Sequence, residues 1–224
     1  MEIITPHATI ETPLSHIADY LRLIESYGRV CHKSEEHIDE DSAEPFIRKF
    51  MIEMGHESVL EHCSVTVRFV CDRSASHQLV RHRLGAYSQE SQRYVNYAGR
   101  GLQVICPPSI RGRAALFERW CAAVEAAEKE YDRLAASGIP PEDARSVLPN
   151  CTKTEVVATF NLRQWRHVFR QRALNPRAQW QIRELTTDLL KQFSRLMPAI
   201  FDDLQREILY KLVFDPEKAP DAED

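Results

Sequence analysis

The chain has 224 residues, of which 43% are hydrophobic, enough to bury a real core as one large domain or two small ones. Its formal net charge is −4, from 29 basic and 33 acidic residues, which disfavours wholesale binding to nucleic acid or to a membrane surface. Because the N-terminus lacks a signal-peptide core and no apolar run approaches the roughly 20 residues needed to cross a bilayer, we expect a cytoplasmic protein.

The first third of the chain predicts an edge strand followed by two helices. Residues 1–10 are extended and apolar enough to begin an edge strand. Residues 15–31 carry apolar side chains at helical spacing, with Gly28 as the expected stop. Residues 44–55 repeat this pattern, with Pro45 near the start and Gly55 just past the end.

A strand and a helix are expected next. Residues 64–72 alternate, with Val65, Val67 and Phe69 on one face, which is typical of a half-buried strand. We expect a helix from residue 73 to 83, which would place Gln78, Arg81 and His82 on neighbouring positions of its surface.

The rest of the chain is predicted to be mostly helical. A long amphipathic helix over 113–137 ends at Gly138, a short helix begins at the prolines of 140–141, and residues 152–160 form a second strand. Asn161 is the expected N-cap of a helix over 162–173, and residues 177–197 form another amphipathic helix. Many helices and few strands, without regular βαβ alternation, predict an α+β fold.

The cysteines and histidines show no recognisable site. The six cysteines are scattered without a CxxC pair, so we interpret them as reduced, mostly buried thiols. His56 and His62 are six residues apart and cannot share one helix face, and His77, His82 and Cys63 add no zinc-like spacing. We therefore predict no metal site. Nor is there a G-x-S-x-G elbow, a G-x-G-x-x-G turn or a P-loop.

The stretch "VRHRLGAYSQESQRYVNY", residues 80–97, has neither a helical nor a strand stripe, and it is dense in hydrogen-bond donors. With Gly85 permitting an unusual backbone, it is best interpreted as a turn that contacts a ligand. Arginine suits phosphate and planar carbonyl groups. The arginines that are candidates for holding an anionic, phosphorylated ligand are Arg81, Arg93, Arg145, Arg163 and Arg172.

A module that binds single-stranded nucleic acid is the main alternative to an enzyme. The arginine-rich residues 163–177, with Trp165, Trp180 and nearby tyrosines, could stack on bases. Both tryptophans fall at core spacing, however, which favours packing.

Four motifs together resemble the flavin-dependent thymidylate synthase family. "RHRLGAYSQESQRY" is similar to the signature R-H-R-x-x-S-x-x-x-x-S-x-R, with Ala86 in place of the first serine and Gln89 where an acidic residue is frequent. "GHESVLEH" (55–62), "DARSVLP" (143–149) and "FNLRQWRHVFRQR" (160–172) resemble three further segments. The resemblance spans roughly residues 45–205. A different flavin or nucleotide enzyme on the same scaffold is the second alternative.

The resemblance implies one domain over 1–214 with a central, small, mostly antiparallel sheet, and an acidic, disordered tail over 215–224. It implies a homotetramer with active sites shared between subunits, and no nucleic-acid or membrane partner. The reaction is reductive methylation of dUMP to dTMP, with methylenetetrahydrofolate as carbon donor and FAD, reduced by NADPH, as hydride carrier. No enzymic nucleophile is implied.

The resemblance also assigns residues. Arg172 would be the catalytic arginine that favours the ionised pyrimidine. The implied FAD contacts are His56, Ser58, Arg81, His82, Arg83, Leu84, Gln89, Asn161, Arg163 and His167. The implied dUMP contacts are Gln78, Arg81, Gln89, Glu90, Ser91, Gln92, Arg93, Arg145 and Arg172.

Overall fold

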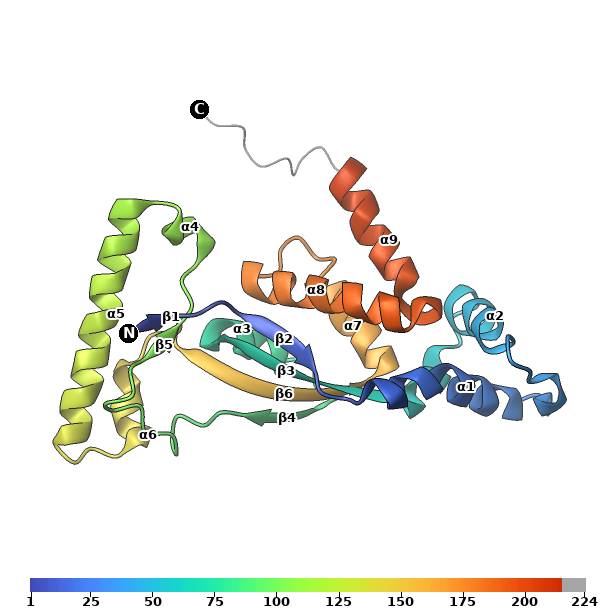
Figure 1. Ribbon diagram of the computed structural model, residues 1–224, viewed down its shortest axis with the longest axis horizontal. Helices are drawn as coiled ribbons and strands as arrows, with labels where there is room; N and C mark the ends of the chain where they lie inside the picture. The colour runs from blue at the N-terminus through green and yellow to red at the C-terminus, as the bar shows by residue number, and fades with distance from the viewer. Residues whose placement is uncertain (215–224) are drawn as a thin grey trace. The chain divides into compact units, whose positions relative to one another are not determined.

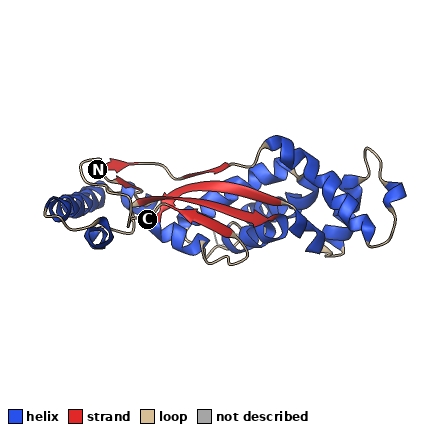
Figure 2. Cartoon of the chain, turned by 90° about the horizontal axis from the view of Figure 1, so that it is seen from below, coloured by secondary structure: helices blue, strands red, loops and turns tan. Residues whose placement is uncertain are grey.

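The computed structural model describes residues 1–214 and, within its last helix, side chains as far as Tyr210. The predicted disordered tail, 215–224, lies outside the described residues. The fold is helix-rich with a small antiparallel sheet, which confirms the predicted α+β class. Its four strands have the order β2 (His7–Ile10), β3 (Ser64–Asp72), β6 (Lys153–Asn161) and β4 (Ala86–Gln89), and lie side by side in Figure 2. A separate parallel pair joins β1 (Glu2–Ile3) to β5 (Gln103–Val104).

The two central strands have one apolar and one polar face. Val65, Val67 and Phe69 of β3 are fully buried, as their alternation predicted. On the other face Thr66 and Thr159 meet across the strands, with 2.8 Å between their hydroxyl oxygens. Burial alternates along β6 as well, so neighbouring residues of this strand point to opposite faces of the sheet.

The described chain divides into two compact units. The first unit comprises Met1–Ala8, Arg68–Arg81 and Tyr87–Val157, and the second comprises Thr9–Val67, His82–Ala86 and the chain from Ala158 onward. Both β3 and β6 contribute residues to each unit. The single domain predicted for 1–214 stays a prediction.

The helices of the first unit are mostly short. They are α3 (Arg73–Leu79), α4 (Pro108–Arg111), α5 (Ala114–Ala136), α6 (Pro141–Ala144) and the 3-10 turn η4 (Arg145–Val147), shown in Figure 1. Helix α5 ends as predicted, with Gly138 at φ +81°.

Helix α3 is shorter than predicted. Asp72 caps its start by accepting a hydrogen bond from the Ala75 amide at 2.7 Å. The helix ends at Leu79, whose carbonyl accepts a hydrogen bond from the Tyr87 hydroxyl at 2.9 Å. Arg81 and His82 therefore follow the helix and do not lie with Gln78 on its surface, contrary to the prediction.

Helices form most of the second unit. They are α1 (Leu14–Val30), η1 (Glu35–His37), α2 (Ala43–Phe46), the π-helix η2 (Ile47–Glu53), η3 (Glu57–His62), α7 (Leu162–Arg172), α8 (Trp180–Leu196) and α9 (Pro198–Phe214). The predicted stop at Gly28 is wrong, because α1 continues to Val30. A Cβ at Gly28 would lie 2.7 Å from the Phe46 ring, so this glycine allows close helix packing.

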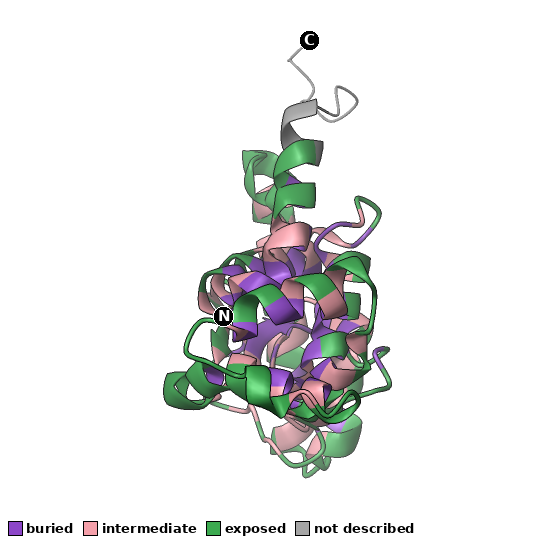
Figure 3. Ribbon diagram, turned by 90° about the vertical axis from the view of Figure 1, so that its right-hand side faces the viewer, coloured by how far each residue is buried: buried purple, intermediate pink, exposed green. Residues whose placement is uncertain are grey.

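An aromatic cluster fills the core of the second unit. Trp165, Phe169, Phe193 and Phe201 are fully buried, and their rings lie 5.1–5.7 Å apart. The Trp165 indole nitrogen donates to the Val65 carbonyl at 3.0 Å. Figure 3 shows buried residues gathered beneath the exposed outer faces of the helices. Trp165 is thus a packing residue, as its spacing predicted, and cannot stack on a base.

Each of the six cysteines is a free thiol, and Cys63, Cys71 and Cys106 are buried. Burial raises the pKa of Cys63 to about 11 and that of Cys71, with a smaller contribution from Asp72, to about 12. Both therefore stay protonated at neutral pH and behave as core residues. Cys121 and Cys151 are partly buried, and Cys31 is exposed.

Candidate functional site

The predicted site residues fall into two groups. Those expected at the nucleotide lie mainly in the first unit: Gln78, Arg81, Gln89, Glu90, Ser91, Gln92, Arg93 and Arg145. Most of those expected at the flavin lie in the second unit together with Arg172: His56, Ser58, His82, Arg83, Leu84, Asn161, Arg163 and His167. Each group is described by itself.

In the second unit, His82 and Arg172 form a direct contact. The Arg172 Nε–H donates to His82 Nε2 at 3.0 Å, so His82 accepts at that nitrogen and is neutral. Burial, and then the positive charge of Arg172 and the nearby His167, lower the pKa of His82 to about 4. Burial also lowers the pKa of Arg172, although a guanidinium stays charged at neutral pH. The pair therefore holds one fixed positive charge beside a neutral imidazole.

The turn after His82 packs closely against β6, and a glycine is required at position 85 for this contact. A Cβ at this position would lie 2.2 Å from Phe160 Cδ1 and 3.0 Å from the Thr159 carbonyl oxygen. The predicted unusual backbone is wrong, because Gly85 is not among the glycines with positive φ. Its role is close approach: the missing side chain lets the turn lie directly on Phe160.

Asn161 is the N-cap of helix α7, as predicted. Its side chain accepts a hydrogen bond from the Gln164 amide at 2.8 Å. Arg163 and His167 are exposed and four residues apart, so they share a face of this helix. The His167 and His82 ring centroids are 5.8 Å apart. His56 and Ser58 are exposed beside the start of η3. The surface of α7 therefore presents hydrogen-bonding groups next to the His82–Arg172 pair.

A buried arginine, which the sequence analysis did not identify, supports this helix. Arg166 is 1% exposed and binds Glu57 at 2.9 Å and Asp203 at 2.6 Å. It also donates to the Ile200 carbonyl. Glu57 contacts Arg163 and Arg170 as well, at 3.8 and 3.5 Å. The motif "GHES" thus contributes the Glu57 carboxylate, which connects η3 to α7. In the sequence, the position of this acidic residue between His56 and Ser58 was the available sign of such a role.

In the first unit, Gln89 points toward α3. Its side-chain amide donates to the hydroxyls of Ser76 at 3.0 Å and Thr154 at 3.3 Å. Ser76 and Thr154 are both buried. Gln78 is partly exposed on the same helix, and Arg81 is exposed just after it.

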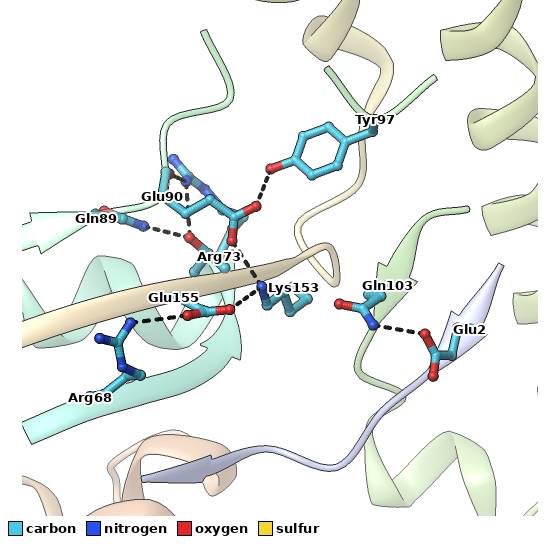
Figure 4. A network of polar contacts seen from close by, with 10 residues as sticks. Glu2, Arg68, Arg73, Gln89, Glu90, Tyr97, Gln103, Lys153 and Glu155 are labelled. Carbon is cyan, nitrogen blue, oxygen red and sulfur yellow. Dashed lines mark hydrogen bonds and ion pairs between the residues drawn. The ribbon is translucent and has the colours of Figure 1, made fainter. Parts of the chain in front are cut away.

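Glu90 belongs to a chain of charges on the other face of β6 (Figure 4). Its carboxylate accepts hydrogen bonds from Tyr97 Oη at 2.8 Å and Lys153 Nζ at 3.1 Å. Lys153 also donates to Glu155 at 2.6 Å, and Glu155 pairs with Arg68 at 3.3 Å. None of Arg68, Tyr97, Lys153 and Glu155 was predicted, although Lys153 and Glu155 stand two apart on a predicted strand and so share a face.

Residues 91–95 form a turn beyond Glu90. The Ser91 carbonyl accepts hydrogen bonds from the amides of Tyr94 and Val95, and the Ser91 hydroxyl accepts from the Arg93 amide at 3.2 Å. Gln92 is buried.

Arg93 and Arg145 converge on Glu142. Arg93 Nε contacts the Glu142 carboxylate at 3.1 Å, and Arg145 Nε donates to the Glu142 carbonyl oxygen at 3.0 Å. The structure therefore brings together two arginines that are 52 positions apart in the sequence. Two cations this close suit an anionic ligand.

A cavity of about 450 Å³ lies beside β4 and β6 in the first unit. Its lining mixes both signs of charge with two valines: Arg68, Ser88, Gln89, Glu90, Val95, Lys153, Glu155 and Val157. Among residues 1–214, the described His, Cys, Asp and Glu side chains form no group of three that could hold a metal ion. Over the same described range, none of the helices is both long and apolar enough to cross a membrane.

Comparison with known proteins gives a consistent result. Residues 14–199 match the family model described as thymidylate synthase complementing protein. The flavin-dependent thymidylate synthase of Geobacter sulfurreducens is 38% identical over 197 residues, which cover 85% of this chain and 84% of the relative. That of Pyrococcus furiosus is 36% identical over 186 residues, covering 82% and 75%.

A solved structure supports the fold. The UMP/dUMP methylase PolB from Streptomyces cacaoi, bound with 5-Br dUMP, superposes with a TM-score of 0.74 at 24% identity, covering 92% of this chain and 97% of that one. At this identity the likeness bears on the fold alone.

Proposed function

The chain belongs to the thymidylate synthase complementing protein family, and we propose that it is a flavin-dependent thymidylate synthase that converts dUMP to dTMP. The observation that carries the proposal is the contact between Arg172 and neutral His82, because it joins two of the family motifs at one point. We assign FAD as the hydride carrier, NADPH as its reductant and methylenetetrahydrofolate as the carbon donor.

Arg172 is the proposed catalytic residue. A uracil ring loses its proton reluctantly at neutral pH, and a fixed guanidinium beside the developing negative charge lowers that free-energy cost. The hydrogen bond to His82 fixes the direction of the Arg172 guanidinium without neutralising it, since His82 carries no charge. A carboxylate partner in that place would have cancelled the charge that the reaction uses.

The second unit offers groups that fit a flavin dinucleotide. Leu84 is 73% exposed, and Arg83, Arg163 and His167 are exposed. An exposed leucine beside several donors suits a flat, partly apolar ring that carries carbonyls and an anionic tail. The bound flavin would supply the redox chemistry, while His56, Ser58, His82 and Asn161 complete the part of the proposed set that lies in this unit. Arg81 and Gln89, the other proposed flavin contacts, belong to the first unit.

The first unit offers groups that fit the nucleotide. We propose that Arg93 and Arg145 exchange their contacts with Glu142 for the phosphate of dUMP, whose two negative charges make it the stronger acceptor. Gln78, Arg81, Gln89, Ser91 and Gln92 complete the proposed contacts, and Glu90 lies in the same segment. Ser91 acts as a ligand and not as a nucleophile.

We propose a homotetramer with shared sites. Leu84 and Tyr94 are 73% and 79% exposed, although both are large, mainly apolar side chains within the stretch that carries the signature motif. Coverage by a ligand or by a second copy of the chain would bury them.

The direct test is release of tritium from dUMP labelled at C5 of the ring. We expect release coupled to dTMP formation, and loss of dTMP when FAD, methylenetetrahydrofolate or NADPH is omitted in turn. A colourless protein that cannot be reconstituted with FAD would contradict the proposal. Flavin binding without dTMP formation from dUMP would favour a different flavin enzyme, and binding of oligonucleotides without flavin would favour the nucleic-acid module.

A further inference from the structure

We propose that Lys153 and Tyr97 are positioning residues that hold Glu90, and through it the segment 89–93, in the geometry that binds the nucleotide. We name residues 89–93 the nucleotide segment. The inference rests on the proposed function for the identity of the ligand, dUMP. Neither Lys153 nor Tyr97 belongs to the motifs that identify the family.

The nucleotide segment is held from both faces of β6. Gln89 reaches the buried Thr154 and Ser76 on the α3 side. Glu90, the next residue, reaches Lys153 on the opposite side, because Lys153 and Thr154 are neighbours on a strand. The side chains of Gln89 and Glu90 therefore hold the segment from opposite faces. In this arrangement Glu90 serves the nucleotide by fixing its neighbours.

The backbone of Glu90 is fixed at the same point. Its amide donates to the Glu155 carbonyl at 2.9 Å, which continues the pairing of β4 with β6 by one residue. Beyond it the chain turns through residues 91–95. Glu90 is thus the last residue of the segment with a backbone hydrogen bond to the sheet, and a shift of its side chain would move Ser91, Gln92 and Arg93 together.

Lys153 also solves an electrostatic problem. A carboxylate inside a segment that binds phosphate repels the ligand, and the carboxylates of Glu90 and Glu155 would repel each other. Lys153 lies between them, 3.1 Å from Glu90 and 2.6 Å from Glu155. Burial lowers the pKa of Lys153, but its hydrogen bonds to Glu155 and Glu90 outweigh this and raise it overall. Its positive charge therefore persists at neutral pH and offsets that of Glu90.

Tyr97 connects the same carboxylate to α5. Its hydroxyl donates to Glu90 at 2.8 Å, while its amide donates to the Tyr131 hydroxyl at 3.3 Å. The two tyrosine rings lie edge to face, 6.0 Å between centroids. Tyr131 is fully buried in α5, so Tyr97 has a rigid support. The Glu90 carboxylate is thereby fixed by one donor from a strand and one from a residue anchored to a helix.

The test compares Lys153→Met, Tyr97→Phe and Lys153→Arg with the control Arg68→Met in the FAD-loaded enzyme. Arg68 contacts the far end of the same chain of charges, at Glu155. We expect the Kd for dUMP to rise roughly 10-fold in Lys153→Met and several-fold in Tyr97→Phe, since each loses a hydrogen bond to a charged group. The value of kcat at saturating dUMP should change about 2-fold or less, and flavin absorption should not change. Lys153→Arg should restore most of the affinity.

A second measurement needs no nucleotide. Amide hydrogen exchange over residues 88–95 should be faster in Lys153→Met than in the wild type, and unchanged in Arg68→Met. Equal exchange in all variants would overturn the inference, and so would a Lys153→Met enzyme with wild-type dUMP affinity. If the wild-type protein does not bind dUMP at all, the proposed function fails, while the exchange rates still decide whether Lys153 holds the segment. If Lys153→Met does not fold, Tyr97→Phe decides by the same two measurements.

Discussion

The part of the signature motif proposed for the flavin and the part proposed for the nucleotide are supported by side chains that differ in burial. In the second unit, His82 and Arg166 are almost fully buried, and each contacts its partners from within the core. In the first unit, Lys153, Glu155 and Arg68 lie on a partly exposed sheet face and form a chain of alternating charges. Both units therefore use charged contacts, but those of the second unit are anchored by a buried side chain, while the chain of charges in the first unit is partly exposed.

This difference in burial predicts how substitutions in each unit affect the protein. A buried charge that loses its partner keeps the full desolvation penalty, so changes in the second unit should affect folding strongly. Partly exposed pairs contribute little to stability, so changes in the first unit should alter the geometry of binding more than the fold. Four predictions test this contrast, beginning with the largest effect.

Arg166→Met should lower the free energy of unfolding by about 3 to 5 kcal/mol, because Glu57 and Asp203 both lose their buried partner. The matched change in the first unit, Arg68→Met, removes a half-exposed pair and should cost less than about 1 kcal/mol. Urea denaturation of both variants measures the difference. Equal losses would show that the contrast between the two units is wrong.

Arg172→Ala should reduce kcat by roughly 100- to 1,000-fold, the usual effect of removing one group that stabilises developing negative charge. The absorption of bound flavin should persist, since the guanidinium acts on the pyrimidine. Arg170→Ala, two residues earlier on α7 and partly exposed beside Glu57, is the control and should keep near-normal turnover. Normal turnover in Arg172→Ala would remove this residue from the mechanism.

Stability should fall as the pH is lowered from about 6.5 to about 4. The pKa of His82 is about 4 in the folded protein and about 6.5 when unfolded, so in this window the unfolded chain binds more protons. The contribution of His82 is at most about 3 kcal/mol, fully present above pH 6.5 and lost below pH 4. Denaturation curves of the wild type and His82→Gln at several pH values isolate it. Identical pH dependence in the two proteins would mean that His82 is not held neutral.

Gly85→Ala should cost about 1 to 3 kcal/mol, because the added methyl group would overlap the Phe160 ring. At Gly112 the new methyl group would meet only the Pro108 carbonyl oxygen at 3.6 Å, so Gly112→Ala should be neutral or slightly stabilising. Thermal unfolding of both variants gives the comparison. A neutral Gly85→Ala would mean that the turn can move away from β6.

Much of the fold was predictable because local patterns and tertiary packing agree. The alternation of Val65, Val67 and Phe69 marked β3, and Asn161 marked the start of α7. Predictions failed where a distant residue decided the outcome. A glycine is needed at position 28 because the Phe46 ring packs against it, and not because the helix stops there. Helix α3 ends early, at Leu79, where the Tyr87 hydroxyl donates a hydrogen bond to the Leu79 carbonyl.

The candidate site divides in the same way. The motifs around residues 55–62, 81–93, 143–149 and 160–172 were readable in the sequence and identify the family. The sequence did not reveal Arg166, Lys153 or Tyr97, because each acts through a partner at least 7 positions away, and for Arg166 and Glu57 the separation is 109 positions.

The sequence by itself therefore determined the α+β class, most of the elements and the motifs whose residues we propose as ligand contacts, since periodicity and motif spacing are local properties. Only the tertiary structure decided that His82 is a neutral partner of Arg172 and that Gln89 and Glu90 reach opposite faces of β6. The physical reason is that burial and hydrogen-bond partners, which set both charge state and direction, depend on residues that come together only when the chain folds.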